Sequence, residues 1–262
     1  MENFKRYAIY WAPEGALAQT AAQWLGWDPL LAQPMPQPDL PNLPRPLADL
    51  TADPRKYGFH GTIKAPFRLA EGLTQSDLSA ALHRFCAHTS PLTLIGLDLT
   101  LIEGFLALIP KGEAAALNDL AARAVIELDR CRAPLTEAEI ARRRPERLTP
   151  RQRDLLAAYG YPHVLEAFQF HLTLSGPLTE AEAAALLPPA TAMFTPVIPH
   201  PFQINDLCLF AEDQIGRFHL LERHALTGPA LAACSAASTR DTPISGVASL
   251  TTSITGIPTG SS

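Results

Sequence analysis

Residues 57–64 read Tyr57-Gly58-Phe59-His60-Gly61-Thr62-Ile63-Lys64, and the chain repeats the pattern in Phe168-Gln169-Phe170-His171-Leu172-Thr173-Leu174-Ser175. Each copy contains an aromatic residue, a histidine, any residue, a threonine and an aliphatic residue. Successive side chains of a β-strand point to opposite faces, so each copy would present its His and Thr on one face and apolar side chains on the other. A single His-x-Thr is typical of many ordinary half-buried strands. The repetition is therefore what indicates two halves of one site.

The flanks of the two copies also repeat in order. Before and after the first copy, apolar patterns predict a strand at 7–11, a helix at 16–27, a proline-rich connection from 29 to 50, a helix from 74, and strands at 91–102 and 105–109. The second series has helices at 113–130, from 136 and from 149, the second motif strand, a helix at 179–187, and strands at 202–210 and 217–226.

This order predicts an α+β fold. We expect a bilobal arrangement of duplicated β-α-β units, with antiparallel sheets facing each other across a central cleft. One catalytic domain would cover 1–228, with a first lobe of about 1–102, a second of about 103–228, and a basic helical insert at 133–160. Ala, Ser, Thr, Gly and Pro dominate residues 229–262, which predicts a low-complexity, disordered tail.

Composition excludes several classes of protein. The formal charge is −5, so the chain as a whole does not attract long nucleic acid or an anionic membrane. Its four cysteines are scattered, without the spacing of a zinc site or a disulfide framework. No apolar run of about 18 residues occurs, and the first residues do not resemble a signal peptide. We expect a cytoplasmic monomer.

The two histidines predict a specific chemistry. An unperturbed imidazole titrates near pH ~6.5, so one of the pair can be neutral and the other protonated at neutral pH. His60 and His171 are therefore candidates for the general base and general acid of a displacement at phosphorus, in either order. Thr62 and Thr173 can each donate a hydroxyl hydrogen bond to a phosphate oxygen. Such a site needs neither a metal nor a cofactor.

Three further residues are candidates for binding the substrate. Lys64 has the parity of His60 and Thr62, so it can add positive charge, although it can equally be solvated. Tyr57 has the opposite parity, which favours packing over binding. Arg143 belongs to the arginine-rich segment 142–153, which is either a solvated helical face or a flap that offers a guanidinium to phosphate.

The repeated motif resembles the two-histidine (2H) phosphoesterase superfamily, which includes the 2′-5′ RNA ligase-like cyclic phosphodiesterases. Several further stretches resemble the branch of that superfamily found in bacterial phosphonate-metabolism operons: 6–10, 57–67, 104–108, 133–144, 148–152 and 170–174. The resemblance covers about residues 4–228. It implies that His60 and His171 are the acid/base pair and that Thr62 and Thr173 bind phosphate.

These observations predict a metal-independent hydrolase of a small cyclic phosphodiester, either a nucleotide or a sugar cyclic phosphate, with a link to phosphonate metabolism. One alternative is an RNA 2′,3′-cyclic phosphodiesterase or 2′-5′ ligase-like enzyme, which would need local basic surface. A second alternative is a protein of the same fold that binds a phosphate ligand without turnover.

Overall fold

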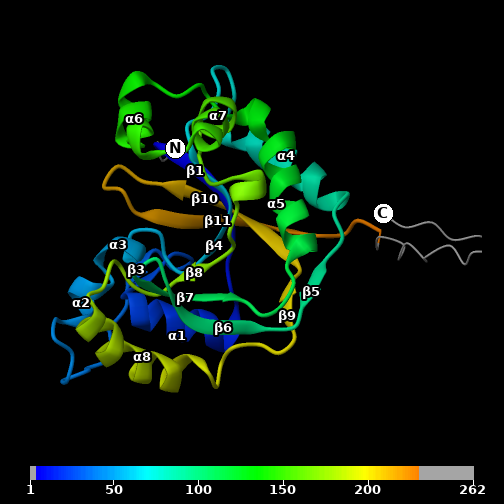
Figure 1. The fold of residues 1–262 in the computed structure, drawn as a ribbon. Coiled ribbons are helices and arrows are strands. Elements are labelled where there is room, and N and C mark those ends of the chain that lie inside the picture. The colour runs from blue at the N-terminus through cyan, green and yellow to red at the C-terminus, as the bar shows by residue number, and fades with distance from the viewer. Residues whose placement is uncertain (1–3, 230–262) are drawn as a thin grey trace, which may run out of the picture. The chain divides into compact units, whose positions relative to one another are not determined.

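A seven-stranded antiparallel sheet forms the centre of the molecule in the computed structural model, which describes residues 4–229 (Figure 1). Its strands lie in the order β11-β10-β1-β4-β8-β7-β6. Their bounds are β1 Arg6–Trp11, β4 Gly61–Phe67, β6 Leu97–Ile102, β7 Phe105–Pro110, β8 Leu172–Thr173, β10 Asp206–Glu212 and β11 Phe218–Ala225. The predicted α+β class with antiparallel sheets is confirmed.

The sheet consists of two half-sheets joined at one residue pair. Strands β11-β10-β1-β4 form the first half and β8-β7-β6 the second, and Gly61 of β4 pairs with Leu172 of β8 at the junction. The half-sheets do not follow the order of the chain. The C-terminal strands β10 and β11 lie beside β1, and the expected lobe boundary near residue 102 falls in the hairpin between β6 and β7.

Four helices share one core with one face of the sheet. They are α1 Gly15–Leu25, α4 Gln75–Ala87, α5 Ala115–Glu127 and α8 Glu180–Phe194. Their buried residues pack with Tyr7, Ile9 and Trp11, the alternate side chains of β1. Tyr10, on the opposite face of β1, belongs to a second, smaller cluster with Phe210 and Phe218. The helices therefore leave the face that carries Tyr10 available for a site.

The helix starts follow their predicted caps. Thr74, Thr136, Thr149 and Thr179 each accept a hydrogen bond from the backbone N–H three residues later, and the side chain at that position bonds back to the cap. One helix end differs from the prediction, because α8 continues through Pro188 and Pro189 to Phe194. Ala190 and Phe194 are fully buried in the core, so tertiary packing outweighs the local cost of the prolines.

Two predicted strands are each divided in the structure. The segment 91–102 forms β5 Leu92–Leu94 and β6, and the segment 202–210 forms β9 Phe202–Ile204 and the start of β10. Strands β5 and β9 pair with each other in a separate two-stranded sheet. The breaks lie at residues 95–96 and at Asn205, positions where a periodicity of two gives no sign of a change of partner strand.

The basic segment forms a compact helical insert. It contains α6 Glu137–Arg142, the 3-10 turn η2 Pro145–Arg147, and α7 Pro150–Tyr159. Arg68, just after β4, binds both carboxylate oxygens of Glu139 at 2.9 Å, which fixes α6 to the end of the motif strand. Leu155 of α7 packs against Val125 of α5 and against Val164. The insert is therefore attached to the body at both of its helices.

The remaining elements are short. The connection between α1 and β4 contains β2 Trp27–Asp28, β3 Gln33–Pro34, α2 Leu47–Leu50 and α3 Ala52–Arg55, and two 3-10 turns lie at η1 Asp129–Cys131 and η3 Leu165–Ala167. Within residues 4–229, no helix has the length and apolarity needed to span a bilayer. The prediction for the tail falls, apart from Pro229, outside the described residues.

Candidate active site

The pairing of Gly61 with Leu172 places the two motifs side by side. In an antiparallel ladder, the residues that flank a directly opposed pair also lie opposite each other. Extending this register by one residue in each direction would set His60 opposite Thr173 and Thr62 opposite His171. All four side chains have the parity opposite to Leu172, which is fully buried in the helix-covered core. The two His-x-Thr motifs thus share one face at the junction of the half-sheets.

Gly61 allows the two strands to approach closely at this junction. A Cβ atom on Gly61 would lie 2.2 Å from Cζ and 2.4 Å from Cε2 of Phe170, distances that real Cβ atoms do not reach. The Phe170 ring is buried in the core and occupies the space beneath the glycine. Gly61 of the first motif and Phe170 of the second are therefore complementary in size, because the ring fills the space that a side chain on residue 61 would need.

Each histidine is oriented by the same local contact. Nδ1 of His60 lies 2.9 Å from the carbonyl oxygen of Gly58, and Nδ1 of His171 lies 2.9 Å from that of Gln169. A carbonyl oxygen only accepts, so Nδ1 carries the hydrogen in both rings. Nε2 is then the nitrogen left to accept a proton when the ring is neutral and to donate one when it is charged. The repeat therefore reproduces the tautomer as well as the residue.

The surroundings of the two rings differ. The His60 ring stacks on Tyr10 with centroids 3.8 Å apart. Burial lowers the pKa of His60 to about 4; the hydrogen bond to Gly58 opposes this shift, and the charge of His171 adds to it. At neutral pH, His60 is therefore an uncharged imidazole. The His171 ring instead lies against Phe105, with centroids 5.5 Å apart.

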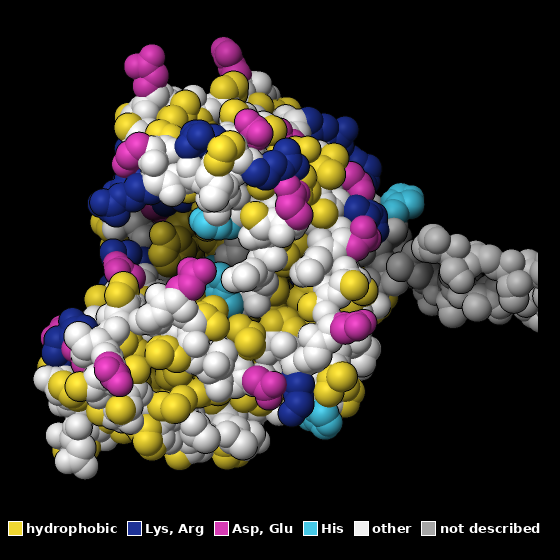
Figure 2. Space-filling model, in the orientation of Figure 1, with side chains coloured by type: hydrophobic (Ala, Val, Ile, Leu, Met, Phe, Trp, Pro, Cys, Tyr) yellow, Lys and Arg dark blue, Asp and Glu magenta, His cyan; other side chains and the backbone are white. Residues whose placement is uncertain are grey.

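A cavity of about 360 Å³ lies over the junction and contains most of the predicted residues. His60, Thr62, Thr173 and Tyr57 line it, together with Arg143 from the insert. Figure 2 shows a hollow in this face of the molecule, with hydrophobic side chains within it and Lys or Arg side chains along one rim. His171 is not among the residues that line this cavity. It lines a separate cavity of about 300 Å³, and Phe105, whose ring lies against His171, lines the main one.

Lys64 does not reach the cavity. It is 3% exposed, and its Nζ donates to the Val125 carbonyl at 3.0 Å and to Oδ1 of Asp129 at 3.2 Å. The cause is a bulge in β4: Tyr10 pairs with Thr62, but the next residue towards the N-terminus of β1, Ile9, pairs with Lys64. The extra residue reverses the alternation, so Lys64 lies on the helix-covered face. The prediction that Lys64 shares the face of His60 and Thr62 is wrong.

Tyr57 and Arg143, two of the candidate binding residues, both line the main cavity. Tyr57 lines it while stacking on Phe218 with centroids 4.9 Å apart, so it packs and is also accessible to a ligand. The Arg143 guanidinium lies 4.9 Å over the ring of Tyr161. Other arginines of the segment have different partners: Arg151 pairs with Glu166, and Arg153 donates to the Leu148 carbonyl. Only part of the basic segment therefore faces the site.

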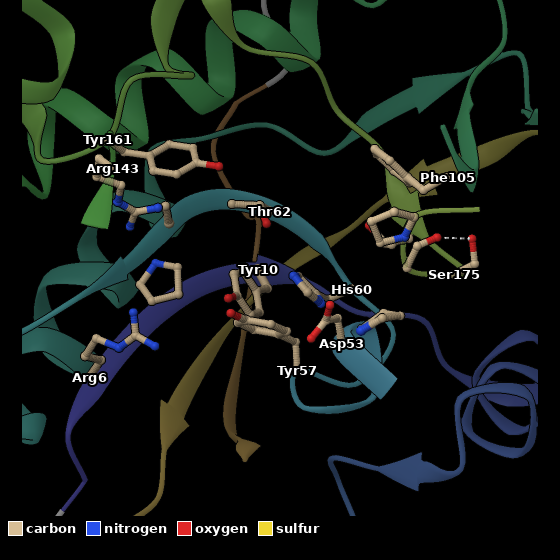
Figure 3. A pocket seen from close by; sticks show the side chains of 16 residues that line it. Arg6, Tyr10, Asp53, Tyr57, His60, Thr62, Phe105, Arg143, Tyr161 and Ser175 are labelled. Carbon is tan, nitrogen blue, oxygen red and sulfur yellow. Dashed lines mark hydrogen bonds between the residues drawn. The ribbon is translucent and has the colours of Figure 1, made fainter. Parts of the chain in front are cut away.

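The structure adds further residues to the site, among them Arg6 and Tyr10 of β1, and it also places Ser175 of the second motif there. Arg6, Tyr10 and Ser175 line the cavity (Figure 3). Arg6 and Tyr10 have the same parity in β1, so alternation along that strand would have grouped them had its partner strand been known. Ser175 accepts a hydrogen bond from the Leu106 N–H and donates one to the Gly176 carbonyl, which fixes the chain after the second motif.

In residues 4–229, no group of three or more His, Cys, Asp or Glu side chains has the arrangement of a metal site. The described cysteines, Cys86, Cys131 and Cys208, are buried and free. Burial raises the pKa of the Cys86 thiol to about 12, so this group is not a nucleophile near neutral pH.

Two curated proteins resemble this chain, and both are named "Ribose 1,5-bisphosphate phosphokinase PhnN". The protein from Janthinobacterium sp. (strain Marseille) is 42% identical over 185 residues, which are 70% of this chain and 41% of that protein. The protein from Laribacter hongkongensis (strain HLHK9) is 33% identical over 215 residues, 80% of this chain and 49% of that protein. The chain therefore spans less than half the length of these relatives.

Solved structures with a similar chain path include E. coli LigT complexed with 3′-AMP. It is 16% identical, has a TM-score of 0.44, and the match covers 86% of this chain and 99% of that one. A crystal structure of a phosphoesterase is also 16% identical, with a TM-score of 0.41, and the match covers 85% of this chain and 99% of that one.

A family model, described as "Protein of unknown function (DUF1045)", matches residues 62–219. The match begins at Thr62 of the first motif and includes the whole of the second, as well as the helical insert. It covers more than half of the chain. The protein belongs to the DUF1045 family.

Proposed function

We propose that the protein hydrolyses a small cyclic phosphodiester to a phosphomonoester, with His60 and His171 as general base and general acid. The observation that carries this proposal is the pairing of Gly61 with Leu172, which brings both His-x-Thr motifs to one face. The Nδ1 contact of each ring leaves Nε2 for proton transfer in both histidines. A displacement at phosphorus needs one group that accepts a proton from the attacking water and one that donates a proton to the leaving oxygen, and two such imidazoles can fill these roles.

The burial of His60 favours it as the base. A pKa lowered to about 4 keeps its Nε2 unprotonated at neutral pH. A water oxygen would form the new bond to phosphorus as its proton passes to Nε2 of His60. The bond from phosphorus to one ester oxygen of the ring would break, and Nε2 of His171, as the general acid, would give that oxygen a proton. Each histidine would contribute roughly 10²–10⁴-fold.

The threonines would stabilise the charge that builds up on phosphorus-bound oxygens. Thr62 and Thr173 both line the cavity from neighbouring strands. Their hydroxyl groups can donate to two non-bridging oxygens at once, because they approach from opposite sides of the junction. Hydrogen bonds to charged groups contribute about 1.5–3 kcal/mol each.

The names of the curated relatives favour a ribose phosphate as the substrate. Opening a cyclic phosphate of ribose yields a ribose phosphomonoester, which is the class of compound that a ribose 1,5-bisphosphate phosphokinase handles. This is also consistent with the predicted link to phosphonate metabolism.

We do not extend the kinase activity itself to this chain. The sequence contains no Gly-Lys pair, which the phosphate-binding loop of many kinases requires. The relatives are more than twice as long as the regions that they share with this chain. We therefore assign the kinase activity to the part of those proteins that this chain does not cover.

The proposal is tested by hydrolysis assays in EDTA with wild-type protein, His60→Ala and His171→Ala. The substrates are ribose cyclic phosphates, nucleoside 2′,3′-cyclic phosphates and a short RNA with a cyclic end. We expect turnover of a small cyclic phosphate that either substitution lowers by at least about 100-fold. Preference for the RNA would favour the ligase-like alternative, and binding without turnover would favour the ligand-binding alternative.

A further inference from the structure

Two arginines lie together at one end of the main cavity. In Figure 3, the guanidinium groups of Arg6 and Arg143 extend towards the cavity on the side opposite Phe105 and Ser175, and Tyr10, Thr62 and His60 lie between these two ends. Arg6 comes from β1 and Arg143 follows α6, so the body and the insert each contribute one. Both arginines also line a neighbouring cavity of about 200 Å³.

Each guanidinium is held in place by contacts that leave donors unused. Arg6 binds Glu212 through Nε at 2.5 Å and Nη2 at 2.9 Å, and its Cζ lies 5.8 Å over the ring of Phe218. Arg143 stacks on Tyr161, and no carboxylate pairs with it within the part of the chain that the structure describes. Rigid, planar guanidinium groups of this kind suit the oxygens of a phosphoryl group.

The charges along the cavity are unequal. Glu212 pairs with Arg6, and Glu139, which lines the neighbouring cavity, pairs with Arg68, so Arg143 has no carboxylate partner among the described residues. The one carboxylate that lines the main cavity in the described residues is Asp53, and it pairs with Lys56 at 2.9 Å. Figure 3 shows Asp53 beside His60, away from the arginines. Besides the two motifs, the end of the cavity that holds Arg6 and Arg143 is therefore the place where a dianion is favoured.

We propose that Arg6 and Arg143 form a second anion site, which binds a phosphoryl group distant from the bond that is broken. Resting on the proposed function, this inference narrows the substrate to a cyclic phosphodiester that carries a terminal phosphomonoester at its other end. A cavity of about 360 Å³ is in the range of sites for small molecules, and it accommodates a pentose between the two anion sites. Tyr10 and Tyr57 would pack against that sugar.

The test compares adenosine 2′,3′-cyclic phosphate with and without a 5′-phosphate, by kcat/KM. The proteins are the wild type, Arg143→Gln, and Arg144→Gln as the matched control, because Arg144 is exposed and lines none of these cavities. We expect the 5′-phosphate to raise kcat/KM of the wild type and of Arg144→Gln at least about tenfold. Arg143→Gln should lose this advantage, so that its kcat/KM values for the two compounds become equal within about threefold.

The proposal would be overturned if the ratio of kcat/KM with the 5′-phosphate to kcat/KM without it were the same in the wild type and in Arg143→Gln. A cyclic-ended dinucleotide, whose second phosphate is a diester, is the third compound. We expect it to gain less than the 5′-phosphorylated one, because a monoester has more charge and one more free oxygen. An equal, Arg143-dependent gain would instead indicate that the arginines bind an RNA backbone, which would also overturn the proposal.

Binding separates this inference from the proposed function. Calorimetry with ribose 5-phosphate on the His60→Ala/His171→Ala protein measures the second site without chemistry. We expect binding that Arg143→Gln weakens at least about fivefold and Arg144→Gln leaves unchanged. Arg143-dependent binding in a protein without any turnover would contradict the proposed function alone. Turnover with no role for Arg143 in binding or rate would contradict the second anion site alone.

Discussion

The two copies of the motif have the same backbone contacts but different neighbours. In both, Nδ1 of the histidine binds the carbonyl two residues earlier, at 2.9 Å. His60, however, stacks on Tyr10 and has its pKa lowered to about 4, whereas His171 lies against Phe105. The two repeats thus orient their imidazoles in the same way, and burial keeps His60 neutral near pH 7. We infer that this difference divides the roles of base and acid.

The residue between His and Thr also differs, because it is Gly61 in the first copy and Leu172 in the second. This difference lets the two copies pack closely. Gly61 has no side chain, and Phe170 from the second copy fills the space beneath it. Leu172, at the centre of the second copy, is fully buried. The copies therefore interlock at their central residues, and substitutions there test the junction on which the account depends.

The largest effect on turnover, beyond removal of the histidines, is expected for Gly61→Ala. The new methyl group would overlap the Phe170 ring, so β4 and β8 must separate. We expect a loss of about 1–3 kcal/mol in the free energy of unfolding and of at least about 100-fold in kcat, since small displacements of catalytic groups are costly. Urea denaturation and steady-state assays measure both.

The control for this change is the pair of variants Phe170→Leu and Gly61→Ala/Phe170→Leu. The smaller leucine should recover part of both losses in the double variant. Full activity and stability of Gly61→Ala alone would show that the strands are not held as close as the structure indicates.

The two threonines should be equivalent although their surroundings differ. Thr62→Val and Thr173→Val each remove one hydroxyl donor while keeping the shape of the side chain. We expect kcat/KM on a cyclic phosphate to fall about 10–100-fold in each, from the loss of a hydrogen bond to a charged oxygen. Thr→Ser at the same positions keeps the hydroxyl and should retain most of the activity. If Thr173→Val were fully active, phosphate would be bound by the first copy alone.

A smaller effect is expected from pH, and it comes from His60. The lowered pKa of His60 means that the unfolded chain binds more protons than the folded one between about pH 6.5 and 4. The free energy of unfolding should therefore fall as the pH falls through this window, by at most about 3 kcal/mol from this group. The acid limb of kcat/KM should likewise lie well below pH 6.5.

Denaturation at several pH values, with His60→Gln beside the wild type, isolates this contribution. The variant should show a flatter pH dependence, and His200→Gln, at an exposed position, should match the wild type. An acid limb near pH 6.5, together with an identical pH dependence of stability in His60→Gln, would mean that His60 is not buried in solution.

The smallest change in turnover is expected for Lys64→Met. Lys64 is buried against Asp129, which also binds Arg132 through Nε at 2.8 Å. The substitution should cost about 1–3 kcal/mol in stability, less than the cost of isolating a buried charge, because Asp129 keeps Arg132. Turnover should change less than about threefold. A large rise in KM with unchanged stability would restore Lys64 as a phosphate ligand.

The sequence predicts the local parts of this site well. Repeated His-x-Thr strands, capped helices and the α+β class follow from periodicity and capping residues, which act over a few neighbouring positions. The bulge that turns Lys64 to the other face depends instead on pairing with β1, a strand more than fifty residues away. Likewise, only the sheet order reveals that Arg6 lies at the cavity, because it places β1 beside β4. The pairing of distant strands therefore determines which side chains reach the cavity, and local sequence patterns do not contain this information.

The most direct test of the division between His60 and His171 uses a leaving group that needs no proton. Wild type, His60→Ala and His171→Ala are compared on a cyclic phosphate and on a 4-nitrophenyl phosphodiester, whose nitrophenolate departs unprotonated. On the cyclic phosphate, both variants should lose at least about 100-fold. On the nitrophenyl ester, His171→Ala should recover to within about tenfold of the wild type, and His60→Ala should stay impaired. Recovery by His60→Ala instead, or equal impairment of both variants on both substrates, would contradict the assignment of base to the first motif and acid to the second.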